Sequence, residues 1–313
     1  MKTKTQLASA LVFLFGLLMA FAWSDGVLAE EGDEAYAKGG AQDCMECHDT
    51  QPTTLVLHTP HAMAGDARTP FASQECESCH GPSSDHMRKV PGELIPPPPK
   101  VVFGQNSITP IEDQNEVCMS CHEGGLRINW TGSEHHSGDV ACATCHTVHA
   151  LKDPVLVKQS QDEVCYACHV EQKAQSFRRS RHPIKEGKVT CSDCHNPHGS
   201  FGPTLLKYSN VNETCYSCHT EKRGPFLWEH APVRDDCTNC HTPHGSSQPR
   251  LLKIRTPYLC QQCHIEAFHP STLYSGDDIL PFGAGERILA KGCLNCHPKV
   301  HGSNHPGGVR LTR

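Results

Sequence analysis

The sequence predicts an elongated fold that is mostly coil with short helices and has little or no β-sheet. Three observations lead to this prediction. The pattern Cys-x-x-Cys-His occurs ten times and uses all twenty cysteines of the 313-residue chain. Glycine and proline are frequent, at 25 and 23 residues, which favours loops over long regular elements. Aromatic residues make up only 6% of the chain, so the side chains alone would form a poor apolar core.

The repeated pattern is the attachment signature of c-type haem. Two thiols form thioethers with the haem vinyl groups, and the histidine after the second cysteine supplies an axial imidazole to the iron. We therefore predict ten covalently bound haem c groups, attached at Cys44, Cys47, Cys76, Cys79, Cys118, Cys121, Cys142, Cys145, Cys165, Cys168, Cys191, Cys194, Cys215, Cys218, Cys237, Cys240, Cys260, Cys263, Cys293 and Cys296. The proximal ligands would be His48, His80, His122, His146, His169, His195, His219, His241, His264 and His297.

Two other uses of paired cysteines are disfavoured. Zinc sites need no histidine directly after the second cysteine, and disulfide frameworks do not place cysteines two residues apart ten times over. A chain of 313 residues is also too short to bury ten porphyrins in separate hydrophobic cores. The predicted fold class is therefore a multihaem cytochrome c whose core is formed by stacked haems.

The N-terminus is typical of a secretory signal peptide over residues 1–29, with Lys2 and Lys4 before an apolar run and Ala29 at the cleavage site. An uncleaved membrane anchor is the alternative, because the apolar run of 7–23 approaches the roughly 20 residues that span a bilayer. We favour cleavage, which places the mature chain in the periplasm. The formal net charge of −6 argues against a nucleic-acid partner.

The motifs alternate between two kinds, so residues 30–313 are predicted to form one decahaem unit of five two-haem repeats, with two five-haem halves meeting near Ala174 as an alternative. Each even-numbered motif has one histidine downstream and one upstream. These are His86, His149, His198, His244 and His301 downstream, and His61, His136, His182, His230 and His269 upstream. They supply one distal ligand for each iron. Three choices are close: His136 against His135, His61 against His58, and His301 against His305.

This count predicts bis-histidine ligation at every iron, which implies low reduction potentials and leaves no open position for a substrate. Methionine is the usual competing ligand, but those of the mature chain lie inside motifs (Met45, Met119) or beside histidines (Met63, Met87). We therefore predict no catalytic residue. Which distal histidine serves which haem cannot be assigned from the sequence.

Local patterns predict a few further elements. A polar cap at Asn212 begins a turn leading into Cys215. Helices are expected over 165–179 and 286–291. The longest insertion between motifs, 81–117, contains the proline run 96–99, which is predicted to be an extended strap.

Several motifs and their flanks resemble the MtrA/DmsE-type decahaem cytochromes, a family that includes the MtoA and PioA proteins. The matching segments are NETCYSCH at 212–219, EKRGP at 221–225, WEHAPV at 228–233, CSDCHNPHGS at 191–200, QQCH at 261–264 and VHGSNHP at 300–306. The short lead before Cys44 and the proline run depart from the family pattern.

The resemblance implies a wire of closely stacked bis-histidine haems inside an outer-membrane β-barrel porin. Such a wire passes electrons between periplasmic cytochromes or a quinol-linked donor or acceptor and extracellular metal (Fe) or another acceptor or donor, with an extracellular multihaem cytochrome as a further partner. The direction of electron flow is left open. One alternative is a free periplasmic shuttle to a terminal reductase. Another is a multihaem enzyme, which the absence of a Cys-x-x-Cys-Lys motif disfavours.

Overall fold

The structure is a computed structural model that describes residues 35–88, 95–264 and 292–312. The predicted signal peptide, the predicted helix at 286–291 and His269 lie outside these residues. Over the described part the chain is mostly coil with short helices and forms only isolated β-bridges, so the predicted fold class is confirmed. None of its described helices is long and apolar enough to span a membrane.

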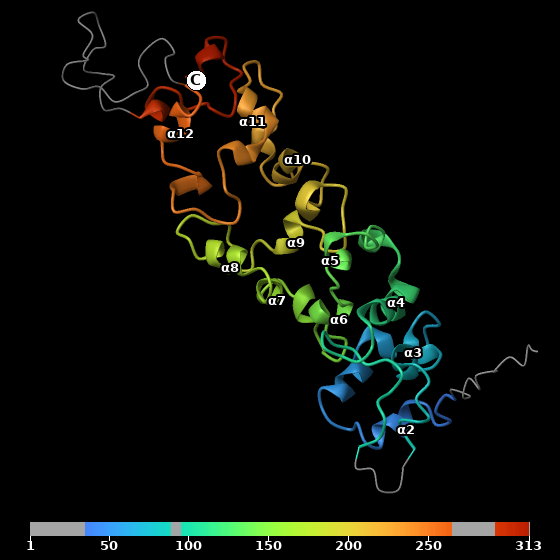
Figure 1. Cartoon of the computed structure of the whole chain (residues 1–313). Helices are drawn as coiled ribbons and strands as arrows, with labels where there is room; N and C mark the ends of the chain where they lie inside the picture. Colours follow the sequence, from blue (N-terminus) through green and yellow to red (C-terminus); the bar gives the residue numbers. More distant parts are fainter. Residues whose placement is uncertain (1–34, 89–94, 265–291, 313) are drawn as a thin grey trace, which may run out of the picture.

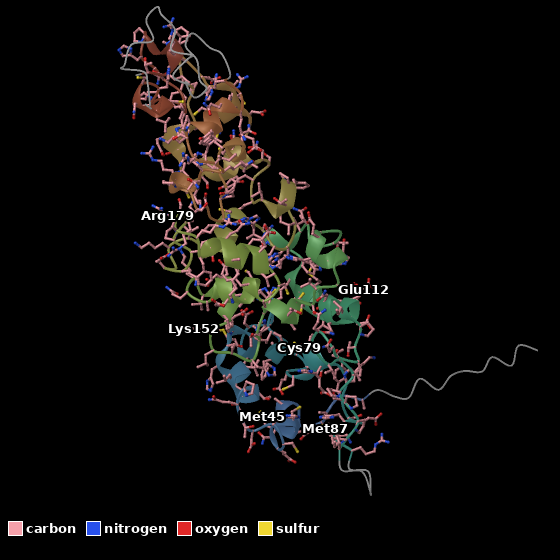
Figure 2. All side chains as sticks on the ribbon, turned by 60° about the vertical axis from the view of Figure 1, so that its left-hand side comes forward. Met45, Cys79, Met87, Glu112, Lys152 and Arg179 are labelled. Atoms are coloured by element: carbon pink, nitrogen blue, oxygen red, sulfur yellow. The ribbon has the colours of Figure 1, made fainter. Side chains whose placement is uncertain are left out.

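The chain runs along an elongated body (Figure 1). Helix α2 lies near one end, the helices from α5 to α9 occupy the middle, and α11 and α12 lie near the other end. Figure 2 shows the same progression, with Met45 and Met87 near the α2 end and Arg179 much farther along. Sequence order is therefore close to spatial order, and consecutive motifs follow one another along the body.

The α-helices are α2 (Ala41–Met45), α3 (Glu77–His80), α4 (Ile111–His122), α5 (Glu134–Ser137), α6 (Cys142–Cys145), α7 (Gln161–Tyr166), α8 (Val170–Ser176), α9 (Cys191–Cys194), α10 (Val211–Tyr216), α11 (Ala231–Asp235) and α12 (Tyr258–Gln261). Short 3-10 turns connect them: η1 (Thr53–His58), η2 (Pro60–Ala62), η3 (Pro70–Ala72), η4 (Gly125–Arg127), η5 (Pro154–Leu156), η6 (Pro203–Leu205), η7 (Thr220–Lys222), η8 (Cys237–Asn239), η9 (Pro249–Leu251), η10 (Cys293–Asn295) and η11 (Gly308–Arg310).

Most of the α-helices contain all or part of a Cys-x-x-Cys-His motif and fold it into one helical turn. The histidine N–H bonds back to the carbonyl of the first cysteine, as in His48 to Cys44 at 3.0 Å and His297 to Cys293 at 2.8 Å. Odd-numbered motifs lie at the end of a helix that begins earlier, such as α4, α7 and α10, whereas α6 and α9 begin at the first cysteine of an even-numbered motif. This turn places both sulfurs and the imidazole of a motif on one side of the backbone.

A buried asparagine ties the two motifs of a repeat together. The Asn212 amide donates to the carbonyls of Val233 and Arg234 at 3.0 and 2.9 Å, and its oxygen accepts the N–H of Cys237 at 2.8 Å. The predicted cap at Asn212 is therefore wrong: Asn210 caps α10 by accepting the Glu213 N–H at 2.8 Å. Asn212 instead fixes the eighth motif against the seventh.

The predicted helix over 165–179 is interrupted. Helix α7 ends at Tyr166 and α8 begins at Val170, because the motif histidine between them, His169, has the non-helical backbone angles φ −86° and ψ 62°. The break gives the imidazole a direction that a continuous helix would not allow. The proline run forms irregular coil, and the carbonyl of Pro97 accepts a hydrogen bond from His86 Nδ1 at 2.6 Å.

Neighbouring repeats are joined by short antiparallel bridges. Ser180 and Ser246 exchange two backbone hydrogen bonds of 3.1 and 2.8 Å, and Trp228 and Ser303 exchange two of 2.9 Å. Each bridge brings an upstream segment of one repeat against a downstream segment of the next. The predicted upstream and downstream histidines lie beside these bridges.

Candidate haem sites

The motif histidines face other histidines across short gaps. Over the described part of the chain, nine pairs of imidazole rings have centroids 6.0 to 6.3 Å apart, and each pair contains one motif histidine. The pairs are His48–His86, His80–His149, His122–His61, His146–His198, His169–His135, His195–His244, His219–His182, His241–His301 and His264–His230.

This separation is suited to a metal ion between the rings. Two imidazoles bound to one metal through nitrogens at about 2 Å have centroids roughly 6 Å apart, since each centroid lies about 1 Å beyond its bonding nitrogen. A channel of about 5400 Å³ runs along seven of these pairs, all except His48–His86 and His80–His149, and is lined by motif cysteines such as Cys118, Cys145, Cys191 and Cys240. The donor set, the ring separation and the space all fit c-type haem.

The pairing follows a rule that interlocks the repeats. An even-numbered motif faces the downstream histidine of the next even-numbered motif, as in His195 with His244. An odd-numbered motif from the third onward faces the upstream histidine of the preceding even-numbered motif, as in His219 with His182. The first motif departs from the rule, because His48 faces His86. His297 belongs to the tenth motif, and His269, which the sequence predicted as a distal ligand without assigning it to a haem, lies outside the described residues.

One predicted distal histidine, His136, stands outside the imidazole pairs of the described chain, and its neighbour His135 stands within one. The ring opposite His169 is that of His135, at 6.1 Å, and not that of the predicted His136. His136 packs edge-on against Trp130, and its Nδ1 accepts the N–H of Gly132 at 3.3 Å. The Ser133 side chain caps α5 by accepting the His136 N–H, which sets the phase of this single turn. In this helical turn the side chain of His135, and not that of His136, faces the motif histidine His169.

In the other two close choices, the structure pairs the residue that the sequence favoured. His61 faces His122 at 6.1 Å and His301 faces His241 at 6.2 Å. His305 instead accepts the N–H of Gly307 at 3.1 Å through Nδ1. Neither His58 nor His305 stands within such a ring pair in the described chain.

The second ring nitrogen of many paired histidines bonds to the main chain. His135, His182 and His230 donate through Nδ1 to the carbonyls of Pro197, Pro243 and Val300 at 2.8, 2.9 and 3.0 Å. These carbonyls come from the following repeat. The bonds hold each ring in orientation and leave Nε2 available as a metal ligand.

Sequence reasoning missed the acceptors of two proximal histidines. His195 donates to the carbonyl of Thr204 at 3.0 Å, and His241 to that of Arg250 at 2.8 Å. Both acceptor residues have left-handed backbones, with φ of 52° and 59°, a conformation that is costly for residues other than glycine. A proline precedes each of them, and the repetition of Pro203 and Pro249 was the available signal.

Glycines directly after two downstream histidines permit close contact between repeats. Gly199 and Gly245 have φ of 104° and 154°, and a Cβ at either position would lie 2.0 Å from a backbone oxygen, that of Asn129 or Gln175. Only glycine fits both the angle and the space. His198 and His244 are thereby brought into the preceding repeat, where their partner motif lies.

Burial lowers the pKa of four downstream histidines and so favours the neutral imidazole, which is the form that binds a metal. It lowers the pKa of His198 to about 4, and the neighbouring His146 adds to the shift. Burial likewise lowers the pKa of His149, His244 and His301.

The cysteines show that the sites follow one another without a gap. Within a repeat the first thiols touch, so the Cys142 thiol raises the pKa of Cys118 by hydrogen bonding. The same contact joins Cys44 to Cys76, Cys165 to Cys191, Cys215 to Cys237 and Cys260 to Cys293. Between repeats the second thiols are near: burial raises the pKa of Cys145, and the Cys168 thiol raises it further. Burial also raises the pKa of Cys79, Cys194 and Cys240, and a second thiol of the neighbouring repeat, that of Cys121, Cys218 and Cys263 respectively, adds to each shift.

Motif cysteines in chain order, with a facing imidazole pair at nine of the ten motif histidines, define a multihaem c-type cytochrome. Residues 76–161 match the model of the cytochrome c-type protein NrfB-like family, and residues 182–224 and 230–269 match a doubled CXXCH motif. The chain is 48% identical to the multiheme cytochrome MtrA of Shewanella baltica over 281 residues, which are 89% of this chain and 83% of the relative. It is 31% identical over 135 residues to the cytochrome c-type protein NrfB of Escherichia coli O6:H1, covering 42% of this chain and 65% of the relative.

The chain belongs to the MtrA family of multihaem cytochromes. It is an electron-transfer protein that binds multiple c-type haem groups through its Cys-x-x-Cys-His motifs.

Proposed function

We propose that each facing histidine pair, together with the two cysteines of its motif, holds one haem, and that the chain binds ten haems with bis-histidine ligation. The ring separation of 6.0 to 6.3 Å supports nine of these assignments. His297 and His269 remain for the tenth. His135 takes the place of the predicted His136.

When bound, each haem supplies a one-electron Fe(III)/Fe(II) couple. The two imidazoles of a pair would hold the haem iron between them and would leave no position on it for a substrate. The hydrogen bonds from Nδ1 and the close backbone contacts at Gly199 and Gly245 hold the paired imidazole rings in fixed orientations. The residues therefore hold and tune a redox centre, and we propose no catalytic role for the chain.

The second part of the proposal is that the ten sites form one wire across the outer membrane, inside a β-barrel porin. It would pass electrons between periplasmic cytochromes or a quinol-linked partner and extracellular metal (Fe) or another acceptor or donor, with an extracellular multihaem cytochrome as a further partner. The observation that supports this most strongly is that the motif cysteines of neighbouring sites lie close enough to interact all along an elongated body (Figure 1). The relationship to MtrA supports the same reading.

Purification from native membranes tests the conduit. We expect the haem-loaded protein in the outer-membrane fraction, and mass spectrometry of the purified complex should identify a porin in stoichiometric amount. A porin alone would indicate delivery or uptake at the barrel mouth, and an added multihaem cytochrome would indicate a longer outward path. Recovery in the soluble periplasmic fraction, with no porin after gentle crosslinking, would contradict the conduit and favour the free periplasmic shuttle.

A further inference from the structure

One proximal histidine differs from its counterparts in its hydrogen-bond acceptor. In four of the even-numbered motifs, Nδ1 of the motif histidine donates to a main-chain carbonyl. These bonds are His80 to Val101 at 2.9 Å, His195 to Thr204 at 3.0 Å, His241 to Arg250 at 2.8 Å and His297 to Arg310 at 2.6 Å. His146 donates instead to a carboxylate, Oδ2 of Asp153, at 2.6 Å.

The repeats of the chain show how this difference arises. The loops after His146, His195 and His241 align on a proline, so Asp153 occupies the position of Gly202 and Gln248. In the two sister loops the acceptor is the carbonyl of the residue after that proline. At the fourth motif the equivalent carbonyl, that of Val155, accepts the Gln161 amide at 2.8 Å. The acceptor has therefore moved from the main chain to the side chain at position 153.

The Asp153 carboxylate is held in place by more than the histidine. Its Oδ1 accepts the backbone N–H groups of Thr147 and Val155 at 3.2 and 3.4 Å, which leaves Oδ2 directed at His146. The Asp153 side chain is 16% exposed, so water screens its charge only partly. On the opposite side of the site, His198 Nδ1 is buried and has no hydrogen-bond partner among the described residues.

A carboxylate that accepts the N–H of a ligating imidazole makes that imidazole a stronger electron donor. Such a charge-assisted bond is stronger than a bond to a neutral carbonyl. Stronger donation and a nearby negative charge both favour Fe(III) over Fe(II), and second-shell hydrogen bonding is an established means of setting haem potential.

We propose that Asp153 lowers the reduction potential of the haem held by His146 and His198, relative to haems whose proximal histidine bonds to a carbonyl. The inference rests on the proposed bis-histidine haem sites. Asp153 acts through His146 and is a positioning and tuning residue. The haem of the fourth motif would then have a lower reduction potential than its neighbours. Electron transfer onto this haem would be thermodynamically unfavourable from either side of the wire.

The test is a spectroscopic redox titration of the haem-loaded full-length protein carrying Asp153→Asn. We expect about one tenth of the haem absorbance change to move to a more positive potential while the rest stays in place. In the EPR spectrum, the g-values of one low-spin species should change. Asp153→Gly, which copies Gly202 of the sister loop, should shift the same fraction in the same direction.

Asp236→Asn is the matched control. Asp236 also lies beside a motif, but it caps η8 by accepting the Thr238 N–H at 2.7 Å and bonds no ligand imidazole. Its charge lies near the Cys215 and Cys237 thiols, so Asp236→Asn measures the effect of a nearby charge alone, and its shift should be smaller than that of Asp153→Asn.

Unchanged potentials in both Asp153 variants, or a shift equal to that of Asp236→Asn, would overturn the tuning role. So would loss of a haem from both Asp153 variants, which would make Asp153 a structural residue only. Failure of the underlying proposal is seen separately, as high-spin iron or fewer than ten haems in the unmutated protein.

Discussion

Replacing His135 with alanine is expected to convert one of ten low-spin irons to high spin, while replacing His136 leaves all ten unchanged. The His135 ring lies 6.1 Å from that of His169, whereas the His136 ring packs against Trp130 at 5.9 Å. Removing His135 leaves the iron on His169 with one open axial position. The measurement is EPR spectroscopy of the oxidised protein, together with carbon monoxide binding to the reduced protein.

One carbon monoxide should bind per His135→Ala molecule and none per His136→Ala molecule. The two residues are adjacent on the single turn of α5, so any general effect on this turn should appear in both variants. The opposite result, with the open iron in His136→Ala, would restore the ligand that the sequence favoured. Carbon monoxide binding in both variants would show that the site depends on the fold of α5 and not on one of the two imidazole rings.

The second large effect is expected from truncation after Lys299. The removed segment contains His301, whose ring lies 6.2 Å from that of His241, so one iron should become high spin. It also contains the carbonyls of Val300 and Arg310, which accept His230 Nδ1 at 3.0 Å and His297 Nδ1 at 2.6 Å, so two further haems should keep these ligands but shift in potential.

The truncation should also destabilise this end of the molecule. The segment exchanges two backbone bonds with Trp228 through Ser303, and the Trp228 indole donates to the His305 carbonyl at 2.8 Å. At about 1 kcal/mol for each such bond, the loss should be a few kcal/mol and lower the melting temperature measurably.

His301→Ala is the matched comparison for the truncation, because it opens the same iron and keeps the segment. It should reproduce the high-spin signal without the potential shifts of the haems on His230 and His297, and with a smaller change in melting temperature. A truncated protein with ten low-spin irons would contradict the His241–His301 pair.

The sequence was sufficient to predict the fold class and nearly the whole set of paired histidines. Each motif is a local turn closed between residues four apart, and local hydrogen bonding follows directly from spacing. Eight of the nine pairs join residues of different repeats, as in His146 with His198, and His48 with His86 is the exception. A repeat pattern shows which residues correspond to each other, but it does not show which repeats touch.

The choice between His135 and His136 could not be made from the sequence for a similar reason, because contacts outside the local pattern decide it. Both are histidines on one turn, and the Ser133 cap and the contact with Pro197 in another repeat decide which one faces the motif. The acceptors at Thr204 and Arg250 were hidden for a different reason. They are main-chain carbonyls directed by left-handed backbones, and their mark in the sequence is only the proline that precedes each of them.

The most direct test is to locate the irons in crystals of the haem-loaded protein by anomalous diffraction at the iron absorption edge. We expect ten peaks in chain order, nine of them midway between the facing rings and the tenth beside His297. An iron bound by a single histidine, a peak beside His136, or a break in the series would contradict a continuous wire of closed bis-histidine sites.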